Sequence, residues 1–514
     1  MTPELPVHAD HLFGRLEAVS ARVPDKVAIV SDSITLSYAE LLQRADAFSA
    51  QLADAGVRSR DRVAVVLPNG AEFVICAFAA WKLGAILTPM HAQLRQAEIV
   101  RYVSDCRARV LVATDAMDGI VRSVMDNCSD TVTHAWIWSK AAARWQSNRG
   151  PGQFATTAAV ADEHCVPDAD SPALTQFSTG STGHPKRITR THRNLVSEVE
   201  AVSRVLGRSA ADRVLGVAPF FHSHGLMNAA LGSILSGATL YAVERFFPRD
   251  LARLIEAEQI TGFPGGPFMF QLLADLPDHI GFASLRWVLS AGAPLLPAVA
   301  AAFQTKFGVP IRELYGCTEA GVLTISGEEE HGGEHTVGLP IPGVKIRIVD
   351  QQGQPVAVGE KGRIEVTSAH AAERYDQSDD RLEAHFVGPC FYPGDLGRVT
   401  PEGRVVLLGR DRGFINVAGN KIDPTEVESV LRELPAVTDV AVLGLPDGAA
   451  EEKVKAVLVV SSPCSREEVL AHCTRRLAPF KIPRVIEFRK ELPTNLMGKL
   501  LRKYLLAEEG TDLG

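Results

Sequence analysis

The chain has 514 residues, of which 46% are hydrophobic and 22% are charged. This composition is ordinary for a globular protein, and the length is too great for a single core, so we expect at least two domains. The formal net charge of −8, with no strongly basic stretch to compensate for it, argues against a nucleic-acid-binding protein.

The cysteines and apolar runs indicate a cytoplasmic protein. The eight cysteines are scattered singly and none forms a C-x-x-C pair, so neither a zinc site nor a disulfide framework is predicted. The opening stretch MTPELPVHADHLFGRL lacks the basic and apolar regions of a secretory signal. Apolar runs such as FVICAFAAW are too short to span a bilayer, so we expect no membrane span.

The first part of the chain alternates strand-like and helix-like segments. Apolar runs at 26–30, 62–68 and 108–114 are predicted strands. The segment between the first two has helical periodicity, opens with the capping box Ser37-x-x-Glu40 and ends at Gly56. AEFVICAFAAWKLG is a second predicted helix. This alternation predicts a largely parallel sheet covered on both faces, whereas the segment from about 120 to 170 has no clear pattern.

The stretch STGSTGHPKR, residues 178–187, combines two glycines, four hydroxyls and a basic pair. Backbone N–H groups, hydroxyls and a lysine are the parts of a phosphate-binding loop. The Walker pattern does not fit, because no Gly-Lys-Ser/Thr follows the first glycine. Taken alone, the stretch is equally consistent with a solvated turn.

Strand and helix signals resume at 213–219 and 285–292, and the pattern changes after about residue 338. Short strands separated by turn sequences there predict an antiparallel, barrel-like subdomain, and EEEHGGEH before it, 328–335, is an expected exposed loop. The block beyond Gly409, about a hundred residues, has the size of a separate α+β domain. The fold class is therefore α/β, with a large domain at 1–408, a hinge at 409–413 and a small domain at 414–514.

Four further stretches carry chemical groups: PFFHSHG (219–225), ELYGCTEAG (313–321), YPGDLG (392–397) and LPTNLMGKLLR (492–502). Each alone has a common structural explanation, such as an aspartate that caps a turn. Together with the loop at 178–187, and in this order, they resemble the motifs of the adenylate-forming superfamily. That superfamily contains acyl-CoA synthetases, adenylation domains and beetle luciferases. The resemblance runs from PDKVAIV near residue 24 to LPTNLMGK near 492 and is strongest to AMP-forming acyl-CoA ligases.

The resemblance implies a reaction in two halves. A carboxylic acid first reacts with ATP to give an acyl-adenylate, and the acyl group then passes to a thiol, with ATP, Mg²⁺ and CoA as cofactor and co-substrates. Thr318 would donate to the α-phosphate, Glu319 would ligate Mg²⁺, and Lys499 would bridge the carboxylate and α-phosphate oxygens. The positions expected to bind ATP or AMP are Ser178, Thr179, Gly180, Ser181, Thr182, Gly183, Lys186, Gly292, Ala293, Tyr315, Gly316, Asp395 and Arg410.

Within that set, the resemblance implies that Tyr315 stacks on adenine and that Asp395, assisted by Arg410, accepts the ribose hydroxyls. For the second half-reaction the small domain would rotate about Arg412, at the hinge position. The loop 417–421 would then face the site, with Gly419 helping to form a tunnel for a pantetheine arm. His222 would lie by the substrate carboxylate and gate this tunnel.

Three positions depart from the family pattern. Arg187 stands where a glycine usually follows the loop lysine, Pro393 stiffens the ribose-binding turn, and Glu313 occupies a position that is often neutral. Each leaves in place the groups that the chemistry requires.

The substrate is expected to be a non-amino acid, because no carboxylate lies in the 220–224 segment to pair with a buried ammonium group. The candidate acyl pocket favours a bulky hydrophobic acid. It consists of Phe221, Phe263, Gly265, Gly266, Phe268 and Ala291.

The leading hypothesis is an AMP-forming acyl-CoA ligase. The main alternative is a stand-alone adenylating enzyme that loads an acyl carrier protein, since both acceptors present the same pantetheine thiol. A non-catalytic nucleotide-binding regulator is disfavoured by Lys499, Glu319 and the intact loop, and luciferase-type oxidation has no positive feature. The sequence leaves open the acid, the acceptor and whether the chain forms a homodimer.

Overall fold

The structure, a computed structural model, describes residues 10–139, 144–147, 167–178, 186–277, 280–327, 336–350, 352–377, 385–410, 415–447, 451–493 and 505. Several predictions lie outside these residues: the loop positions Thr179, Gly180, Ser181, Thr182 and Gly183, the exposed loop 328–335, Arg412 and Lys499. For Ser178 and Arg410 only the backbone is described.

The first of two large sheets has seven strands in the order β7-β6-β5-β3-β4-β8-β9. Its strands are β3 (Arg62–Val66), β4 (Ile86–Pro89), β5 (Val110–Thr114), β6 (His134–Ser139), β7 (Arg144–Ser147), β8 (Pro172–Ser178) and β9 (Lys186–Thr191). The central pairs are parallel, as predicted, while the β6–β7 and β8–β9 pairs at the two edges are antiparallel. Strands β6 and β7 lie in the segment that has no clear sequence pattern.

The second large sheet has nine strands in the order β16-β15-β14-β13-β12-β10-β11-β1-β2. Its strands are β1 (Val27–Val30), β2 (Thr35–Ser37), β10 (Arg213–Gly216), β11 (Thr239–Ala242), β12 (Gly262–Gly265), β13 (Trp287–Ser290), β14 (Ile311–Cys317), β15 (Gly321–Ile325) and β16 (Leu339–Pro340). From β1 to β14 the neighbouring strands are parallel. The predicted α/β fold class is confirmed, with its parallel strands divided between two sheets.

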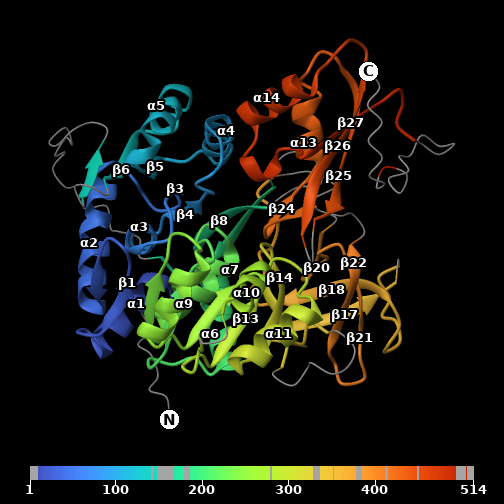
Figure 1. Ribbon diagram of the computed structural model, residues 1–514. Coiled ribbons are helices and arrows are strands. Elements are labelled where there is room, and N and C mark those ends of the chain that lie inside the picture. Colours follow the sequence, from blue (N-terminus) through green and yellow to red (C-terminus); the bar gives the residue numbers. More distant parts are fainter. Residues whose placement is uncertain are drawn as a thin grey trace.

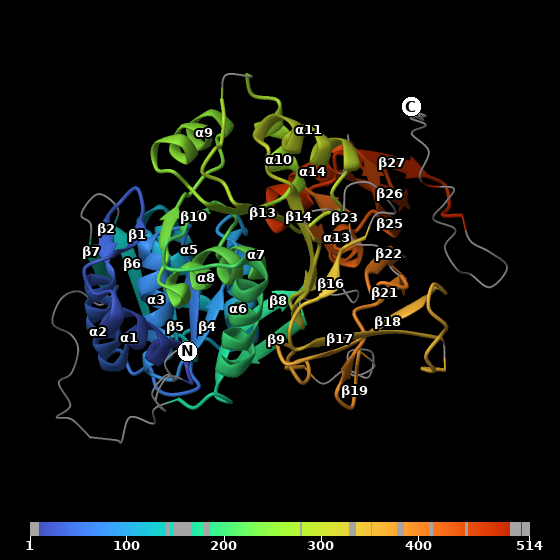
Figure 2. The same cartoon turned by 90° about the horizontal axis from the view of Figure 1, so that it is seen from below.

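Three helices near the N-terminus pack in the region between the two sheets (Figures 1 and 2): α1 (Leu12–Arg22), α2 (Tyr38–Asp54) and α3 (Ala71–Lys82). Helix α2 begins with the predicted capping box, in which Ser37 Oγ accepts from Glu40 N and Glu40 Oε2 accepts from Ser37 N. Every residue of α3 except Lys82 is buried. Its hydrophobic cluster includes Val63 of one sheet and Leu240 of the other, so α3 joins both sheets into one core.

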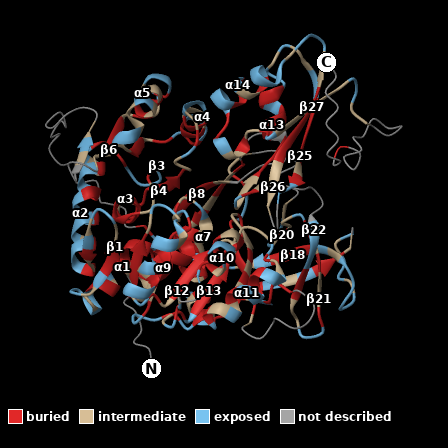
Figure 3. Ribbon diagram, viewed as in Figure 1, coloured by how far each residue is buried: buried red, intermediate tan, exposed pale blue. Residues whose placement is uncertain are grey.

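Helix α6 (His192–Leu206) packs in the same central core, since Leu195 and Val199 belong to its hydrophobic cluster. The remaining helices cover the other faces of the two sheets, and Figure 3 shows mostly buried strands beneath helices with exposed outer surfaces. They are α4 (Gln96–Cys106), α5 (Asp118–Asn127), α9 (Pro248–Ala257), α10 (Pro267–Ala274) and α11 (Pro297–Phe307). The short helices α7 (Ser223–Gly225) and α8 (Gly232–Ser236) flank a π-helical segment, η3 (Leu226–Leu231).

The predicted antiparallel subdomain is confirmed as a six-stranded sheet at one side of the molecule. Its strands are β17 (Val344–Val349), β18 (Gly362–Ser368), β19 (Phe386–Val387), β20 (Cys390–Phe391), β21 (Asp395–Val399) and β22 (Val405–Arg410). All of its pairings are antiparallel.

The C-terminal part has its own hydrophobic core, as expected of a separate α+β domain. It contains the hairpin β23 (Ile415–Val417) and β24 (Asn420–Ile422), then α13 (Pro424–Leu431), β25 (Val437–Pro446), β26 (Glu452–Val460), α14 (Arg466–Arg476), η4 (Pro479–Lys481) and β27 (Val485–Arg489). We refer to it as the small domain; its predicted boundaries stay a prediction. No helix in the described part of the chain is long and apolar enough to cross a membrane.

Candidate active site

The candidate site lies where four parallel strands end. Strands β10, β12, β13 and β14 are neighbours in the nine-stranded sheet and run in the same direction. Their carboxyl ends therefore meet at one edge, which is where α/β sheets usually bind ligands. The segments at or after these ends carry the predicted residues His222, Gly265, Gly266, Ala291, Gly292, Ala293, Thr318 and Glu319.

A hydrogen-bonded glutamine holds the 221–223 segment against the other sheet. Gln176 of β8 donates from Nε2 to the carbonyl oxygen of Phe221 (3.1 Å), and its Oε1 accepts from Ser223 Oγ (2.7 Å). Gln176 is buried and was not among the predicted site residues. It positions the segment that carries His222 next to the strand that leads into the phosphate loop.

Both histidines of this segment are neutral at physiological pH. Nε2 of His224 lies 3.2 Å from the carbonyl oxygen of Gly265, and Nδ1 lies 3.2 Å from Asn228 Nδ2, so Nε2 carries the proton. Burial lowers the pKa of His224 to about 4. For His222, desolvation and then the charge of Lys421 lower the pKa to about 3. His222 nevertheless keeps an exposed surface, as a group that contacts substrate must.

Two motifs that are eighty residues apart meet through one hydrogen bond. Tyr315 on β14 donates from its hydroxyl to Asp395 Oδ2 over 2.6 Å, and both side chains are buried. Asp395 pairs with Arg410 across β21 and β22. The preceding Gly394 has a φ of 81°, a left-handed conformation that favours glycine. The predicted ribose-binding residues are thus adjacent, and Tyr315 additionally fixes the orientation of the Asp395 carboxylate.

A second tyrosine links the phosphate loop to the candidate metal ligand. Tyr375 donates from its hydroxyl to Glu319 Oε1 (2.8 Å), and Lys186 Nζ lies 5.4 Å from the centre of the Tyr375 ring. Tyr375 was not predicted from the sequence. A single carboxylate close to a lysine fits Mg²⁺, which binds through one or two carboxylates together with substrate phosphates. No cluster of three or more potential metal ligands occurs among the described residues, so ATP would supply the rest.

The segment expected to contact adenine also contacts the small domain. Gly292 has a φ of 93°, and a Cβ built on it would lie 3.7 Å from the carbonyl oxygen of Gly419. Asn416 Nδ2 is 3.5 Å from the carbonyl oxygen of Gly292. The turn of the β23–β24 hairpin, which contains Gly419, therefore lies directly against this edge of the nucleotide site. Gly316 cannot carry a side chain, since its Cβ would lie 2.5 Å from the Gly321 carbonyl oxygen.

Residues 16–376 match the family model described as AMP-binding enzyme, and residues 426–499 match the AMP-binding enzyme C-terminal domain. The chain belongs to the AMP-binding enzyme family. It is 29% identical over 539 residues to a long-chain-fatty-acid–CoA ligase of Bacillus subtilis, with 98% of this chain and 96% of that relative covered.

Two solved structures resemble this chain over nearly its whole length. The o-succinylbenzoate CoA synthetase of B. subtilis, bound with its product analogue OSB-NCoA, superposes with a TM-score of 0.84 at 26% identity, covering 96% of this chain and 98% of that one. ATP-bound MatB of Rhodopseudomonas palustris superposes with a TM-score of 0.70 at 25% identity, covering 97% and 98%.

The predicted acyl-pocket residues of this AMP-binding enzyme occupy different environments. Phe263 is fully buried against Phe270 (5.2 Å between ring centres), so it packs behind Gly265 in the core. Phe268 is partly buried, and a Cβ on Gly266 would lie 3.4 Å from its ring. Phe221 lies 4.3 Å from the ring of His91, a residue that the sequence did not indicate.

The three residues that depart from the family pattern lie in different surroundings. The backbone N of Arg187 donates to Gln377 Oε1 (2.8 Å) and Arg187 Nε lies 4.0 Å from Asp376 Oδ2, which draws this residue toward the 376–377 segment. Glu313 is buried on β14, and Pro393 lies in the turn before Asp395.

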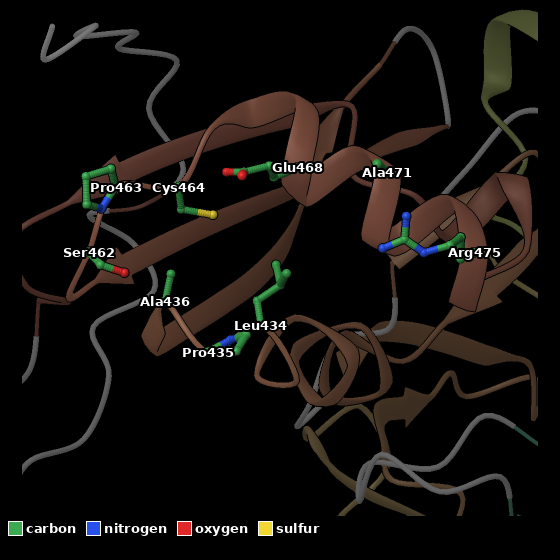
Figure 4. Close-up of a pocket in the computed structure, with 9 residues that line it drawn as sticks. All are labelled: Leu434, Pro435, Ala436, Ser462, Pro463, Cys464, Glu468, Ala471 and Arg475. Atoms are coloured by element: carbon green, nitrogen blue, oxygen red, sulfur yellow. The ribbon is translucent and has the colours of Figure 1, made fainter.

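A hollow in the small domain is separate from these residues. Figure 4 shows its lining, which comes entirely from residues 434–436 and 462–475 and includes Cys464, Glu468 and Arg475. None of the predicted site residues belongs to it.

The Tyr315–Asp395 hydrogen bond can be tested with Tyr315→Phe. Losing a hydrogen bond to a buried carboxylate costs about 1 kcal/mol or more, so we expect the KM for ATP to rise about 3- to 10-fold. The kcat should change less than about twofold, because the hydroxyl orients the ribose site and does not touch the reacting atoms. Steady-state kinetics with varied ATP measures both. Tyr241→Phe is the matched control, since Tyr241 makes a similar bond to Glu258 away from the site (2.8 Å); an equal rise in both variants would contradict the assignment.

Because His222 stays neutral, we expect its contribution to the adenylation rate to be independent of pH near neutrality. Because the pKa of His222 is about 3, well below the ordinary value of 6.5, the ring stays neutral from pH 5.5 to 8. The unfolded state binds more protons over the interval from 6.5 down to 3, so this group lowers stability only as the pH falls through that interval. We expect the ratio of adenylation rates for the parent enzyme and His222→Gln, measured by pyrophosphate exchange, to be constant over pH 5.5–8. A ratio that changes tenfold around pH 6.5 would show that His222 titrates there.

Proposed function

We propose that this AMP-binding enzyme activates an apolar, non-amino carboxylic acid with ATP and transfers the acyl group to the thiol of CoA. The chain is an acid–thiol ligase of the AMP-forming type. The observation that carries the proposal is the meeting of the nucleotide site with the β23–β24 hairpin, through Asn416 and Gly292. This contact brings the segment expected to guide a pantetheine arm to the edge where the adenylate would lie.

In the first half-reaction a carboxylate oxygen of the acid attacks the α-phosphorus of ATP. The bond between the α-phosphorus and the bridging oxygen breaks, and pyrophosphate leaves with the bonding electron pair. Lys186 and Glu319 lie on either side of Tyr375, where phosphate charge would collect. Mg²⁺ held by Glu319 would neutralise part of that charge. Tyr315 and Asp395 would hold the ribose, and Lys499 is the proposed bridge between the reacting anions.

His222 is suited to orient the acid. Its Nδ1 is 3.4 Å from the backbone N of His224 and accepts from it, so the proton of the neutral ring is on Nε2. Nε2 can therefore donate to an oxygen of the substrate carboxylate. A neutral donor orients the carboxylate without the strong ion pairing that would weaken it as a nucleophile.

In the second half-reaction the CoA sulfur attacks the acyl carbonyl carbon. The bond from that carbon to the phosphate oxygen breaks, AMP leaves with the electron pair, and the thiol proton passes to solvent. The products are an acyl-CoA and AMP. We propose that Gly419 leaves room for the pantetheine arm beside Gly292, because neither residue carries a side chain.

The apolar nature of the acid is supported by the residues after β10 and β12. Phe221 and Phe268 provide partly buried rings, and the absence of a side chain at Gly266 keeps the space next to the Phe268 ring open. The 220–224 segment contains no carboxylate that could pair with an ammonium group. The relatives act on different acids according to their names, a long-chain fatty acid and o-succinylbenzoate, so the individual acid is a matter for experiment.

The function is tested by pyrophosphate release over a panel of fatty, aryl and polycyclic acids, with and without CoA. We expect release that depends on the acid, is reduced at least about a hundredfold by Lys499→Ala, and yields acyl-CoA when CoA is present. Lys490→Ala, at an exposed lysine after β27, is the matched control and should be unaffected. Adenylation without acyl-CoA would direct the acyl group to a carrier protein instead, and no release with any acid would contradict adenylation itself.

The acyl pocket is tested by Gly266→Val. The backbone of Gly266 is extended, with φ −105° and ψ 162°, so valine fits without backbone strain and its methyl groups would approach the Phe268 ring. We expect kcat/KM to fall about 10- to 100-fold for the bulkiest accepted acid and less than about threefold for short-chain acids. Competition between the two acids measures this directly. Gly281→Val, at an exposed glycine with no neighbour within 4 Å, is the control; equal losses for all acids would place Gly266 outside the pocket.

A further inference from the structure

A buried cluster of charges joins the small domain to helix α4. Lys481, at the end of η4, places Nζ 2.9 Å from Glu98 Oε1 of α4 and 3.0 Å from Glu426 Oε1 of α13. All three side chains are less than one-tenth exposed. In Figure 1, α4 and α13 face each other across the junction between the two parts of the molecule.

The charges of this cluster are balanced. Arg101, one turn along α4 from Glu98, lies 3.2 Å from Glu426 Oε1, so two cations meet two carboxylates. Glu98 is fixed by its own helix, because Oε2 accepts from the backbone N of Arg95 (2.9 Å). Burial alone would lower the pKa of Lys481, but Tyr102, Glu426 and Glu98 together raise it, so the lysine stays charged.

An aromatic stack beside the cluster reaches the substrate segment. The ring of His91, which follows β4, lies 5.0 Å from the ring of Phe480 in the small domain and 4.3 Å from the ring of Phe221. Phe480 immediately precedes Lys481. The position of η4 therefore affects both the charge cluster, through Lys481, and the segment that carries His222, through Phe480 and His91.

The same docking places the β23–β24 hairpin at the nucleotide site through Asn416 and Gly292. We propose that Lys481, Glu98 and Glu426 are positioning residues that hold the small domain in the thioester-forming arrangement and make no contribution to adenylation. This inference rests on the proposed two-step function, in which the small domain must present a different surface to the site in each half.

Physical chemistry explains why charges serve this purpose better than apolar contacts. A buried ion pair gains about as much from attraction as its ions lose in dehydration, so it adds little net stability. When the domains separate, Lys481 parts from Glu98 and Arg101 parts from Glu426, and water can hydrate the freed charges, so the arrangement stays reversible. A misdocked domain, however, would leave a buried charge unpaired, which is strongly unfavourable. The cluster thus favours one docked position of the small domain while adding little to the free energy needed to leave it.

The test separates the two half-reactions in the full-length enzyme. Adenylation is measured by acid-dependent exchange of pyrophosphate into ATP without CoA, and thioester formation by single turnover of supplied acyl-adenylate with CoA. The variants are Lys481→Met, Glu98→Gln and the double variant Glu98→Gln with Lys481→Met. Arg484→Met is the matched control, because it removes an exposed positive charge from the same domain, where Arg484 meets Asp447 (3.4 Å).

We expect Lys481→Met to slow thioester formation about 10- to 100-fold while exchange stays within about twofold of the parent. Glu98→Gln should act in the same direction, and the double variant should lose less than the product of the two single losses, because both partners of one pair are removed together. Arg484→Met should match the parent. Retained exchange also shows that each variant is folded. Equal rates of thioester formation in the parent and Lys481→Met, or equal losses in both half-reactions, would overturn the inference. A parent enzyme that forms no acyl-CoA would instead contradict the proposed function, so the two failures are distinguishable.

Discussion

The geometry of the site depends on the parallel pairing of β10, β12, β13 and β14. Parallel neighbours must all end at the same edge, and the segments that follow them have no freedom to diverge until they have left the sheet. That constraint gathers a histidine, two glycines, an adenine-contacting segment and a carboxylate from positions spread over about a hundred residues. The six-stranded antiparallel sheet contributes Asp395, and the hydrogen bond from Tyr315 of β14 to Asp395 links the two sheets.

Hydroxyl groups on tyrosine orient two carboxylates of the candidate site. Tyr315 holds Asp395 and Tyr375 holds Glu319, in each case through a hydrogen bond shorter than 3 Å. A carboxylate that already accepts one hydrogen bond keeps a defined direction for its remaining lone pairs, so little reorganisation is needed when substrate arrives. Charge at the small-domain junction is arranged by a different principle, with ions of opposite sign paired directly and water excluded.

Local signals in the sequence were sufficient for much of the fold. The capping box at Ser37 gave the start of α2, and the apolar runs gave β3 and β5, because these features depend only on neighbouring residues. The division of strands between two sheets could not be obtained in this way, since β1 pairs with β11 across about two hundred residues. Strands β6 and β7 also lacked a pattern, because β6 is buried over its first half and partly exposed over its second instead of alternating along its length.

The motifs indicated the candidate site residues but not the residues that support them. Gln176, Tyr375, His91 and Lys481 lie outside the motifs, and each acts through a partner far away in the chain, so spacing alone could not indicate them. Phe263 is a predicted acyl-pocket residue whose side chain is fully buried. Its ring packs against Phe270 of α10 on the same face of β12 as Gly265, and this packing depends on a helix that the strand pattern alone does not place.

The charge cluster at α4 also bears on how such enzymes can be recombined. Glu98 and Arg101 belong to the large domain, while Glu426 and Lys481 belong to two separate segments of the small one. A chimaera that took its last hundred residues from a relative would inherit half of this arrangement without its complement. Exchanging α4 together with the C-terminal part would keep all four charges matched. A chimaera of such enzymes should therefore exchange two segments that are separate in the sequence.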